Sequence, residues 1–289
     1  MWPALIVVAG SLLLLVLPLP PAVQTPLRAA WIVALAALAA WQVGRLVLAQ
    51  RHLVAAWLRL PSHRAPATYV RALFDAYADR YDTHLLRDLH YAAPNLVRTI
   101  VGDRLEGRPD CRIADLGCGT GLCGPLFRRI TARLVGVDLS PGMLREARRR
   151  GIYDELVEDE VVRFLGRHRA TFDLLIAADV LVYVGDLEPV FRAAAAAMRD
   201  DALMAATVEE EPGDGFSLHA SGRFAHGEAY LRRVADAAGL RVLDMRRAPI
   251  RREAGEPVAG LVVLLARPPV IGRAQPSQET AAHAMAGPS

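Results

Sequence analysis

The stretch Cys111-Arg-Ile-Ala-Asp-Leu-Gly-Cys-Gly-Thr-Gly121 decides the fold of this chain. It is typical of a short buried strand that ends in an acidic residue, Asp115, and then turns through Gly117, Gly119 and Gly121. A glycine-rich turn between a strand and a helix lets the backbone approach a nucleotide-like ligand and points helix N–H groups at it. The carboxylate of Asp115 suits a ligand that carries positive charge better than it suits a pyrophosphate.

A second acidic residue follows at the spacing of a Rossmann unit. Arg133-Leu-Val-Gly-Val-Asp138 is another short apolar strand that ends in a carboxylate, and Asp138 follows Gly117 by 21 residues. At about this distance the second strand of such a unit offers its acid to a ribose. Two ribose hydroxyls can donate in parallel to the two oxygens of one carboxylate. The two motifs together therefore predict a nucleoside site.

Charge is unevenly distributed along the 289 residues. The net charge is +3, but residues 1–64 contain five arginines and no acid, so the rest of the chain is slightly acidic. A domain without an excess of basic residues gives no indication of nucleic-acid binding. The chain has no lysine, which excludes a phosphate-binding P-loop.

The three cysteines, Cys111, Cys118 and Cys123, lie in or beside the glycine-rich turn. Their spacing is that of neither a zinc site nor a redox pair, and no metal site is predicted. We expect them to fill small apolar positions in a protein of a reducing compartment.

Two uncharged apolar stretches precede the α/β pattern, Trp2–Val23 and Ala29–Gly44. The dense apolar core of the first, Ala4–Leu19, and the whole of the second are each slightly shorter than the roughly 20 residues that cross a bilayer, and tryptophans and arginines at the ends could complete each span. We favour a transmembrane hairpin, with a signal peptide or a pair of buried or interfacial helices as alternatives. Four arginines follow the second stretch and one lies between the two, which predicts an inner-membrane protein whose C-terminal domain faces the cytoplasm.

The remainder alternates strand and helix patterns, as in an open α/β sheet. The predicted strands are 113–116, 134–138, 155–158, 172–178 and 203–208, and the predicted helices are 67–90, 122–130, 141–150, 187–198 and 226–238. The last two apolar runs, 240–245 and 258–265, have only the polar stretch 246–257 between them, so they are expected to pair as an antiparallel hairpin. The chain thus divides into two apolar helices (1–51), a juxtamembrane helix and linker (52–66), an α/β domain (67–267) and a disordered tail (268–289).

The motifs resemble those of the class I S-adenosylmethionine-dependent methyltransferases over about residues 67–267. Asp115-Leu-Gly-Cys-Gly-Thr-Gly121 is similar to that family's first motif, Val135-Gly-Val-Asp-Leu-Ser140 to its second, and Phe172–Asp179 with Val180–Val184 to the stretch after its fourth strand. The resemblance implies a Rossmann-like, mostly parallel, seven-stranded sheet with a C-terminal antiparallel hairpin, here preceded by the N-terminal helical membrane hairpin.

A narrower resemblance concerns the segment before the first strand. Phe74-Asp-Ala-Tyr-Ala-Asp-Arg-Tyr-Asp-Thr-His-Leu85, Tyr183–Glu188 and Gly222–His226 resemble a bacterial subgroup of predicted methyltransferases. Some members of that subgroup carry tetratricopeptide repeats ahead of the catalytic domain. In this chain the two apolar segments stand in their place.

The family resemblance also implies a set of residues that bind S-adenosylmethionine. Asp115 would lie near the methionine ammonium, and Asp138 would hold the ribose hydroxyls. The other implied contacts are Gly117, Gly119 and Gly121 at the methionyl and ribose end, Met143 against the adenine, Asp159 or Glu160 at the adenine amino group, and Ala178 beside the departing methyl.

Methyl transfer needs an acceptor held in line with the carbon–sulfur bond, and a base only if the acceptor is protonated. The candidate catalytic residues are Asp179 and His226, with Tyr183 and His84 as further candidates near the mouth. Each histidine is alternatively a packed or surface residue. Tyr77 and Tyr81 are expected either to cover the cofactor or to pack within their helix.

The acceptor and its atom stay open at this level, as does the oligomeric state. The apolar N-terminus favours a membrane partner and a small-molecule, lipid or quinone-like acceptor. One alternative is a membrane-anchored module that binds S-adenosylmethionine or a partner without catalysis. A nicotinamide-dependent oxidoreductase is a remote alternative, because Asp115 and Gly117 precede the formal glycine fingerprint Gly119–Gly124 and because the C-terminal hairpin does not fit that fold.

Overall fold

The computed structural model describes residues 32–37, 52–58, 60–82, 91–108, 110–253 and 255–269. The chain divides into two compact units, Met1–Val54 and Ala55–Ser289. Residues 32–37 are helical, but the predicted membrane helices otherwise lie outside the described residues, as does the predicted tail beyond residue 269. Within the described ranges, no helix combines the length and the apolar character that a bilayer crossing requires.

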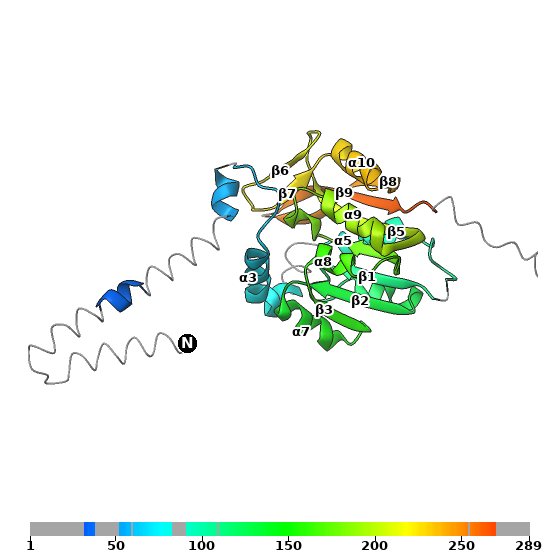
Figure 1. Cartoon of the computed structure of the whole chain (residues 1–289), viewed down its shortest axis with the longest axis horizontal. Helices are drawn as coiled ribbons and strands as arrows, with labels where there is room; N and C mark the ends of the chain where they lie inside the picture. Colours follow the sequence, from blue (N-terminus) through cyan, green and yellow to red (C-terminus); the bar gives the residue numbers. More distant parts are fainter. Residues whose placement is uncertain are drawn as a thin grey trace, which may run out of the picture. The chain divides into compact units, whose positions relative to one another are not determined.

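The second unit is an α/β domain built on one sheet (Figure 1). Its strands are β1 (Arg112–Leu116), β2 (Arg133–Asp138), β3 (Glu155–Glu158), β4 (Phe172–Ala177), β5 (Met198–Glu210), β6 (Phe216–Leu218), β7 (Phe224–His226), β8 (Arg241–Glu253) and β9 (Glu256–Ala266). The strands β3-β2-β1-β4-β5 are parallel. β9 then pairs antiparallel with β5, and β8 pairs antiparallel with β9. The predicted mostly parallel sheet and its antiparallel C-terminal hairpin are confirmed. The predicted number of seven strands is wrong, because the described residues form a sheet of nine, to which β6 and β7 add.

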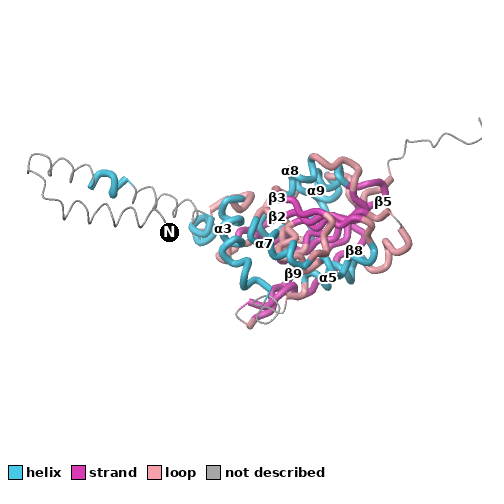
Figure 2. The backbone as a smooth tube through the Cα atoms, turned by 90° about the horizontal axis from the view of Figure 1, so that it is seen from below, coloured by secondary structure: helices cyan, strands magenta, loops and turns pink. Residues whose placement is uncertain are grey.

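Helices cover both faces of this sheet. They are α3 (Ala67–Tyr77), α5 (Ala93–Val101), α6 (Gly124–Phe127), α7 (Pro141–Arg150), α8 (Val161–Gly166), α9 (Glu188–Ala197) and α10 (Glu228–Ala237), with the short 3₁₀ turns η1 (Ala78–Arg80), η2 (Arg128–Ile130) and η3 (Leu181–Tyr183). Figure 2 shows α8 and α9 on one side of the strands and α5 on the other. The core is split accordingly into two apolar clusters, and β4 is buried along its whole length because both of its faces are covered.

The short hairpin β6–β7 is absent from the sequence-based prediction, which placed the start of a helix at His226. β7 extends the sheet at the carboxyl end of β5, where Glu210 pairs with His226. The helix α10 begins only at Glu228, because Gly227 is extended and its N–H donates to the carbonyl of Gly215 at 2.8 Å. A Cβ at Gly227 would lie 1.8 Å from the oxygen of Gly213, so the loop packs directly on this backbone.

The segment 60–82, called here the entry segment, docks on the carboxyl edge of the sheet. The N–H of Ala65 donates to the carbonyl of Tyr183 at 2.9 Å, so the predicted linker is hydrogen-bonded to the domain. Farther along, Asp75 accepts from Ser140 Oγ at 2.6 Å and from the N–H of Gly142 at 2.9 Å. These bonds hold α3 against the start of α7 (Figure 1).

Candidate functional site

A cavity lies where the carboxyl ends of β1, β2 and β4 meet the entry segment. Its empty volume is about 1040 Å³ when the opening to solvent is included. The residues predicted from the sequence that line it are Asp115, Gly117, Gly119, Asp138, Asp159, Glu160, Ala178 and Asp179, together with Tyr81 and Tyr183. Most of the predicted nucleoside residues therefore share one cavity with Asp179, one of the two main catalytic candidates.

The glycine-rich turn follows β1 with positive φ at each of its three predicted glycines. A Cβ at Gly117 would lie 2.3 Å from Val180 Cγ2, so the turn packs against the segment after β4. At Gly119 the nearest atom to such a Cβ is Tyr81 Cε1 at 3.9 Å. The backbone of Gly119 thus borders open space in the cavity, as close approach of a ligand requires.

Asp138, at the end of β2, is fixed by the turn that it faces. Its Oδ2 accepts from the N–H of Gly119 and its Oδ1 from the N–H of Ser140, both at 2.8 Å. Burial raises the pKa of Asp138 to about 6, although these backbone bonds oppose the shift. Each carboxylate oxygen keeps a further lone pair, which matches the two hydroxyls of a ribose.

Asp115, at the end of β1, is 1% exposed. Its Oδ2 accepts a hydrogen bond from the hydroxyl of Tyr153 at 2.5 Å, and among the described residues no cation pairs with it. Burial raises the pKa of Asp115 to about 7, and the nearby charge of Asp138 contributes. A buried carboxylate without a positive partner fits a ligand that brings its own ammonium or sulfonium group.

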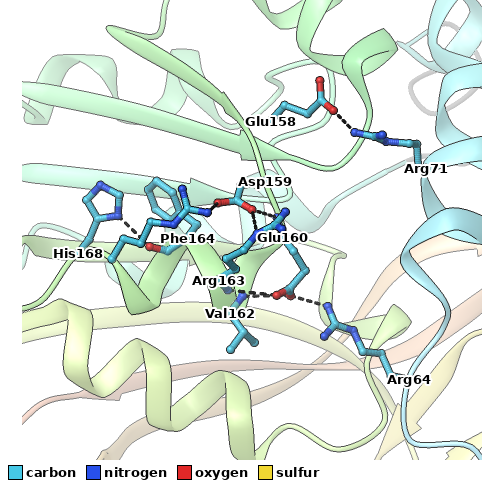
Figure 3. Close-up of polar contacts among 10 residues, drawn as sticks. Arg64, Arg71, Glu158, Asp159, Glu160, Val162, Arg163, Phe164 and His168 are labelled. Atoms are coloured by element: carbon cyan, nitrogen blue, oxygen red, sulfur yellow. Dashed lines mark hydrogen bonds and ion pairs between the residues drawn. The ribbon is translucent and has the colours of Figure 1, made fainter.

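The acids after β3, Asp159 and Glu160, also line the cavity, and Figure 3 shows their polar contacts. Asp159 is 4% exposed and already accepts from the N–H of Glu160 at 2.7 Å and from the side chains of Arg163 and Arg167. Glu160 caps α8 by accepting from the N–H groups of Val162 and Arg163, at 3.0 and 3.1 Å. Both predicted adenine contacts therefore have structural bonds as well, and the contact itself stays a prediction.

Two arginines of the entry segment reach across to these acids. Arg64 forms an ion pair with Glu160, and Arg71 forms one with Glu158 while its Nε donates to the carbonyl of Leu139 at 2.9 Å. Figure 3 shows both side chains extending from the entry segment toward the end of β3. The entry segment is thus held at this edge of the cavity by contacts that are half-exposed.

The other end of the cavity, called here the acceptor end, is aromatic. It is lined by Phe74, Tyr81, Tyr91 and Tyr183 together with Ala178 and Asp179. Burial raises the pKa of Tyr81 and of Tyr91, so both hydroxyls stay protonated and neutral. Tyr91 donates to the carbonyl of Ala178 at 3.4 Å. Tyr81 lines the cavity as predicted, whereas Tyr77 packs edge-to-face on Tyr81 and is outside the lining.

Asp179 sits in an unusual backbone conformation directly after β4. Its φ is +58°, a region that costs a residue with a side chain of order 1–3 kcal/mol. Its N–H donates to Thr207 Oγ1 at 2.8 Å, and its Oδ1 accepts from Arg251 Nη1 at 2.9 Å. The carboxylate is therefore held in a defined position at the acceptor end.

Three predicted residues lie outside the cavity lining. Gly121 has a φ of +90°, and a Cβ there would lie 2.8 Å from the ring of Tyr153. Met143 is 1% exposed within the start of α7. His226 is fully buried, its Nε2 donates to the carbonyls of Val184 and Gly185, and burial lowers its pKa to about 4. His226 therefore supports the loop behind the cavity, and His84 lies outside the described residues.

Sequence reasoning missed Tyr153, Glu209 and Arg251. Tyr153 comes from the loop before β3, and no motif marks it. Glu209 is the second-last residue of β5 and its side chain is buried, and Arg251 lies in the stretch that was predicted to be a polar connection. Within the described ranges, no three His, Cys, Asp or Glu side chains gather as a metal site.

The sheet order, the glycine turn and the two acids at the tips of β1 and β2 define the nucleoside-binding edge of a class I S-adenosylmethionine-dependent methyltransferase domain. Residues 114–204 match a family described as a methyltransferase domain. The matched stretch, about a third of the chain, is thus similar to a methyltransferase domain, and the fold and this match support S-adenosylmethionine as the cofactor.

Individual relatives agree with this assignment. A ubiquinone biosynthesis O-methyltransferase of Methylocella silvestris is 35% identical over 127 residues, which is 41% of this chain and 48% of that protein. The chain thus spans about half the length of this curated relative.

Solved structures share the fold. The 1,6-didemethyltoxoflavin-N1-methyltransferase of Burkholderia thailandensis, with bound S-adenosylhomocysteine, superposes with a TM-score of 0.56 at 21% identity, covering 72% of this chain and 92% of that one. The magnesium protoporphyrin IX methyltransferase of Synechocystis, with bound S-adenosylmethionine, gives a TM-score of 0.52 at 18% identity, covering 70% and 96%.

Proposed function

We propose that this chain transfers the methyl group of S-adenosylmethionine to a hydroxyl group on a small aromatic, quinone-like acceptor. The observation that carries the proposal is the acceptor end, where aromatic walls surround one fixed carboxylate, that of Asp179. Flat aromatic rings pack well against Phe74, Tyr81, Tyr91 and Tyr183, and a phenolic hydroxyl can donate to Asp179.

The chain's own residues have three tasks in this reaction. S-adenosylmethionine supplies a methyl group that is already electrophilic, because it is bonded to a sulfonium. The glycine turn, Asp115 and Asp138 would hold the nucleoside, and the aromatic walls would align the acceptor and exclude water, an effect worth up to roughly 7–11 kcal/mol. Asp179 would accept the hydroxyl proton as the oxygen–carbon bond forms, and burial raises its pKa toward that role.

The relatives support the class of reaction and leave the acceptor atom to experiment. The Methylocella relative is named as an O-methyltransferase of ubiquinone biosynthesis, whereas the Burkholderia structure is named as an N1-methyltransferase. We favour oxygen because a phenolic proton gives the carboxylate of Asp179 a function.

The test is a methyl-label transfer assay with the purified full chain in detergent. Catechol, 3,4-dihydroxytoluene and the aniline analogue of each would be supplied with labelled S-adenosylmethionine, and methylated product and S-adenosylhomocysteine would be measured together. O-methylated product from the catechols supports the proposal. Tight cofactor binding by calorimetry without any S-adenosylhomocysteine, with these probes or with a bacterial membrane extract, would instead favour a non-catalytic binding module.

We further propose that the enzyme works at the inner membrane with its α/β domain in the cytoplasm. The support is the apolar character of residues 1–51, the five arginines of residues 1–64, and the exposure of Trp57, which is 76% exposed, beside Leu58 and Leu60. Fractionation of cells that express the tagged chain should place it in the membrane pellet after a carbonate wash. Recovery of all the protein in the supernatant would contradict the proposal.

A further inference from the structure

A buried cluster of charged side chains stands behind the acceptor end. The side chain of Arg251 is 2% exposed, and it bonds to Asp179 at 2.9 Å, to Glu253 at 2.9 Å, and to Glu209. The side chain of Glu209 is 8% exposed and that of Asp179 is 14% exposed. One guanidinium group thus serves three carboxylates, two of which are also buried.

The C-terminal hairpin aims Arg251 inward by means of a β-bulge. The register of β8 against β9 shifts between Pro249 and Arg251, so that the neighbouring residues Ile250 and Arg251 are both buried. Gly260 on β9 makes room for this bulge, because a Cβ there would lie 2.7 Å from Ile250 Cγ2. A β-bulge next to an active site commonly redirects a side chain in this way.

A second arginine, Arg223, completes the cluster. It forms an ion pair with Glu253 and a hydrogen bond with Tyr183, which lines the cavity. The groups that face Asp179 are therefore Arg251, Arg223, Glu209 and Glu253, with the neutral hydroxyls of Tyr81 and Tyr91 on the cavity side. With each ionised, three carboxylates oppose two guanidinium groups, and both arginines are already engaged with carboxylates of the cluster.

We propose that Glu209 and Arg251 select acceptors by charge. The net negative cluster that they form with Asp179 admits uncharged acceptors and excludes acceptors that carry a carboxylate or a phosphate. This inference rests on the proposed function and names the acceptor class for the same cavity. Arg251 acts here as a positioning residue, because it holds the carboxylate of Asp179 in place and is too buried to receive an anionic group of the acceptor. An acceptor anion in this low-dielectric end would meet repulsion, because Arg223 and Arg251 are already paired with carboxylates of the cluster.

The test separates binding from turnover. The full chain, saturated with S-adenosylhomocysteine, is titrated by calorimetry with two probes of similar shape, catechol and 3,4-dihydroxybenzoate. We expect catechol to bind at least about tenfold more tightly than the benzoate. The ratio of the two dissociation constants is the readout, because a purely structural effect would change both probes together.

Variants then test whether the charge of the cluster sets the ratio of the two dissociation constants. Glu209→Gln keeps a hydrogen-bond acceptor for Arg251 but removes one negative charge, so the ratio should fall to within about threefold. Arg251→Lys keeps the positive charge, so it should weaken both probes and leave the ratio near the wild-type value. Glu210→Gln is the matched control, since Glu210 is adjacent in β5 but pairs at the surface with Arg247. Unchanged affinity for S-adenosylhomocysteine shows that each variant is folded.

Equal binding of the two probes, tighter binding of the benzoate, or no binding of catechol would each overturn the inference. A ratio that stays at its wild-type value in Glu209→Gln would do so as well. The ratio of dissociation constants can fall in Glu209→Gln as expected while no probe or extract component is methylated. In that case the charge selection holds and the proposed catalytic function fails. The two claims are therefore distinguishable.

Discussion

The two ends of the cavity are built in different ways. The nucleoside end uses residues from short, adjacent stretches of chain, the glycine turn after β1 and Asp138 at the end of β2, which pair side by side in the sheet. The acceptor end gathers Phe74 and Tyr91 from before the sheet and Asp179 after β4, and Glu209 on β5 and Arg251 on β8 stand behind it. Local motifs therefore bind the common cofactor, and distant segments together form the part that distinguishes acceptors.

The two ends also differ in how the charge of their carboxylates is neutralised. At the nucleoside end Asp115 is buried, and within the described part of the chain its side-chain partner is the hydroxyl of Tyr153, so its charge is left for the ligand to neutralise. At the acceptor end Asp179 is already neutralised in part by a buried guanidinium group. The first arrangement depends on the ligand for its stability, whereas the second is complete within the protein.

The largest difference between the ends should appear in protein stability. In Arg251→Gln, the carboxylates of Asp179 and Glu209 lose their shared cation while they stay buried. Breaking such a buried pair costs about 3–5 kcal/mol, which denaturant unfolding of the full chain would measure. The surface variant Arg246→Gln on the same strand is the control, because Arg246 pairs with Asp244 in solvent. A loss below about 1 kcal/mol in Arg251→Gln would show that the cluster is not what holds the acceptor end.

The next largest effect concerns the nucleoside end. Asp138→Ala removes the acceptor for the ribose and for the N–H groups of Gly119 and Ser140. Affinity for S-adenosylmethionine should fall about 10- to 100-fold, as for a lost hydrogen bond to a charged group. Calorimetry measures this, with Glu155→Ala as the control because Glu155 forms only an exposed pair with Arg133. Retained affinity in Asp138→Ala would place the ribose elsewhere.

A pH dependence should distinguish the two acids at the nucleoside end. Asp115, with a pKa of about 7, must be ionised to bind the methionine ammonium, so affinity for S-adenosylmethionine should fall up to about tenfold per unit as pH drops below about 7. Adenosine lacks that ammonium and should lose affinity only below about 6, where Asp138 takes up a proton.

Tyr153→Phe sharpens this measurement. The hydroxyl of Tyr153 stabilises the ionised Asp115, so its removal raises the pKa of Asp115 and should move the midpoint for S-adenosylmethionine to higher pH. The adenosine curve should stay in place. Identical shifts for both ligands would mean that Asp115 does not face the ammonium.

The smallest effect is expected at the half-exposed contacts of the entry segment. Arg71 and Glu158 are 45% and 46% exposed, and pairs of this kind contribute about 0–1 kcal/mol. Arg71→Gln should therefore change S-adenosylmethionine affinity by no more than about threefold, and 0.5 M salt should reduce the difference further. A loss as large as that of Asp138→Ala would make this arginine part of the nucleoside end.

Prediction from the sequence succeeded for the strands and helices that local patterns mark. The positions of β2, β3 and α7 agree closely with the expected ranges, because apolar runs and the cap at Ser140 mark them locally. His226 shows the limit: its type suggested catalysis, but β6–β7 pairing turns it toward the carbonyls of Val184 and Gly185. Met143 on α7 is likewise buried and does not line the cavity.

The sequence alone determined the class of sheet, the cofactor class and the two carboxylates at the tips of β1 and β2 that line the cavity, because alternation of strand and helix and the spacing of Gly117, Gly119 and Asp138 are local properties of the chain. Only the tertiary structure decided what stands behind Asp179. Arg251 lies in a run of polar residues that resembles a solvated connection, and it enters the core only because a bulge against Gly260 reverses the side-chain alternation of β8. Pairing between strands that are distant in sequence decides which charged side chains leave water, and no single stretch of residues contains that information.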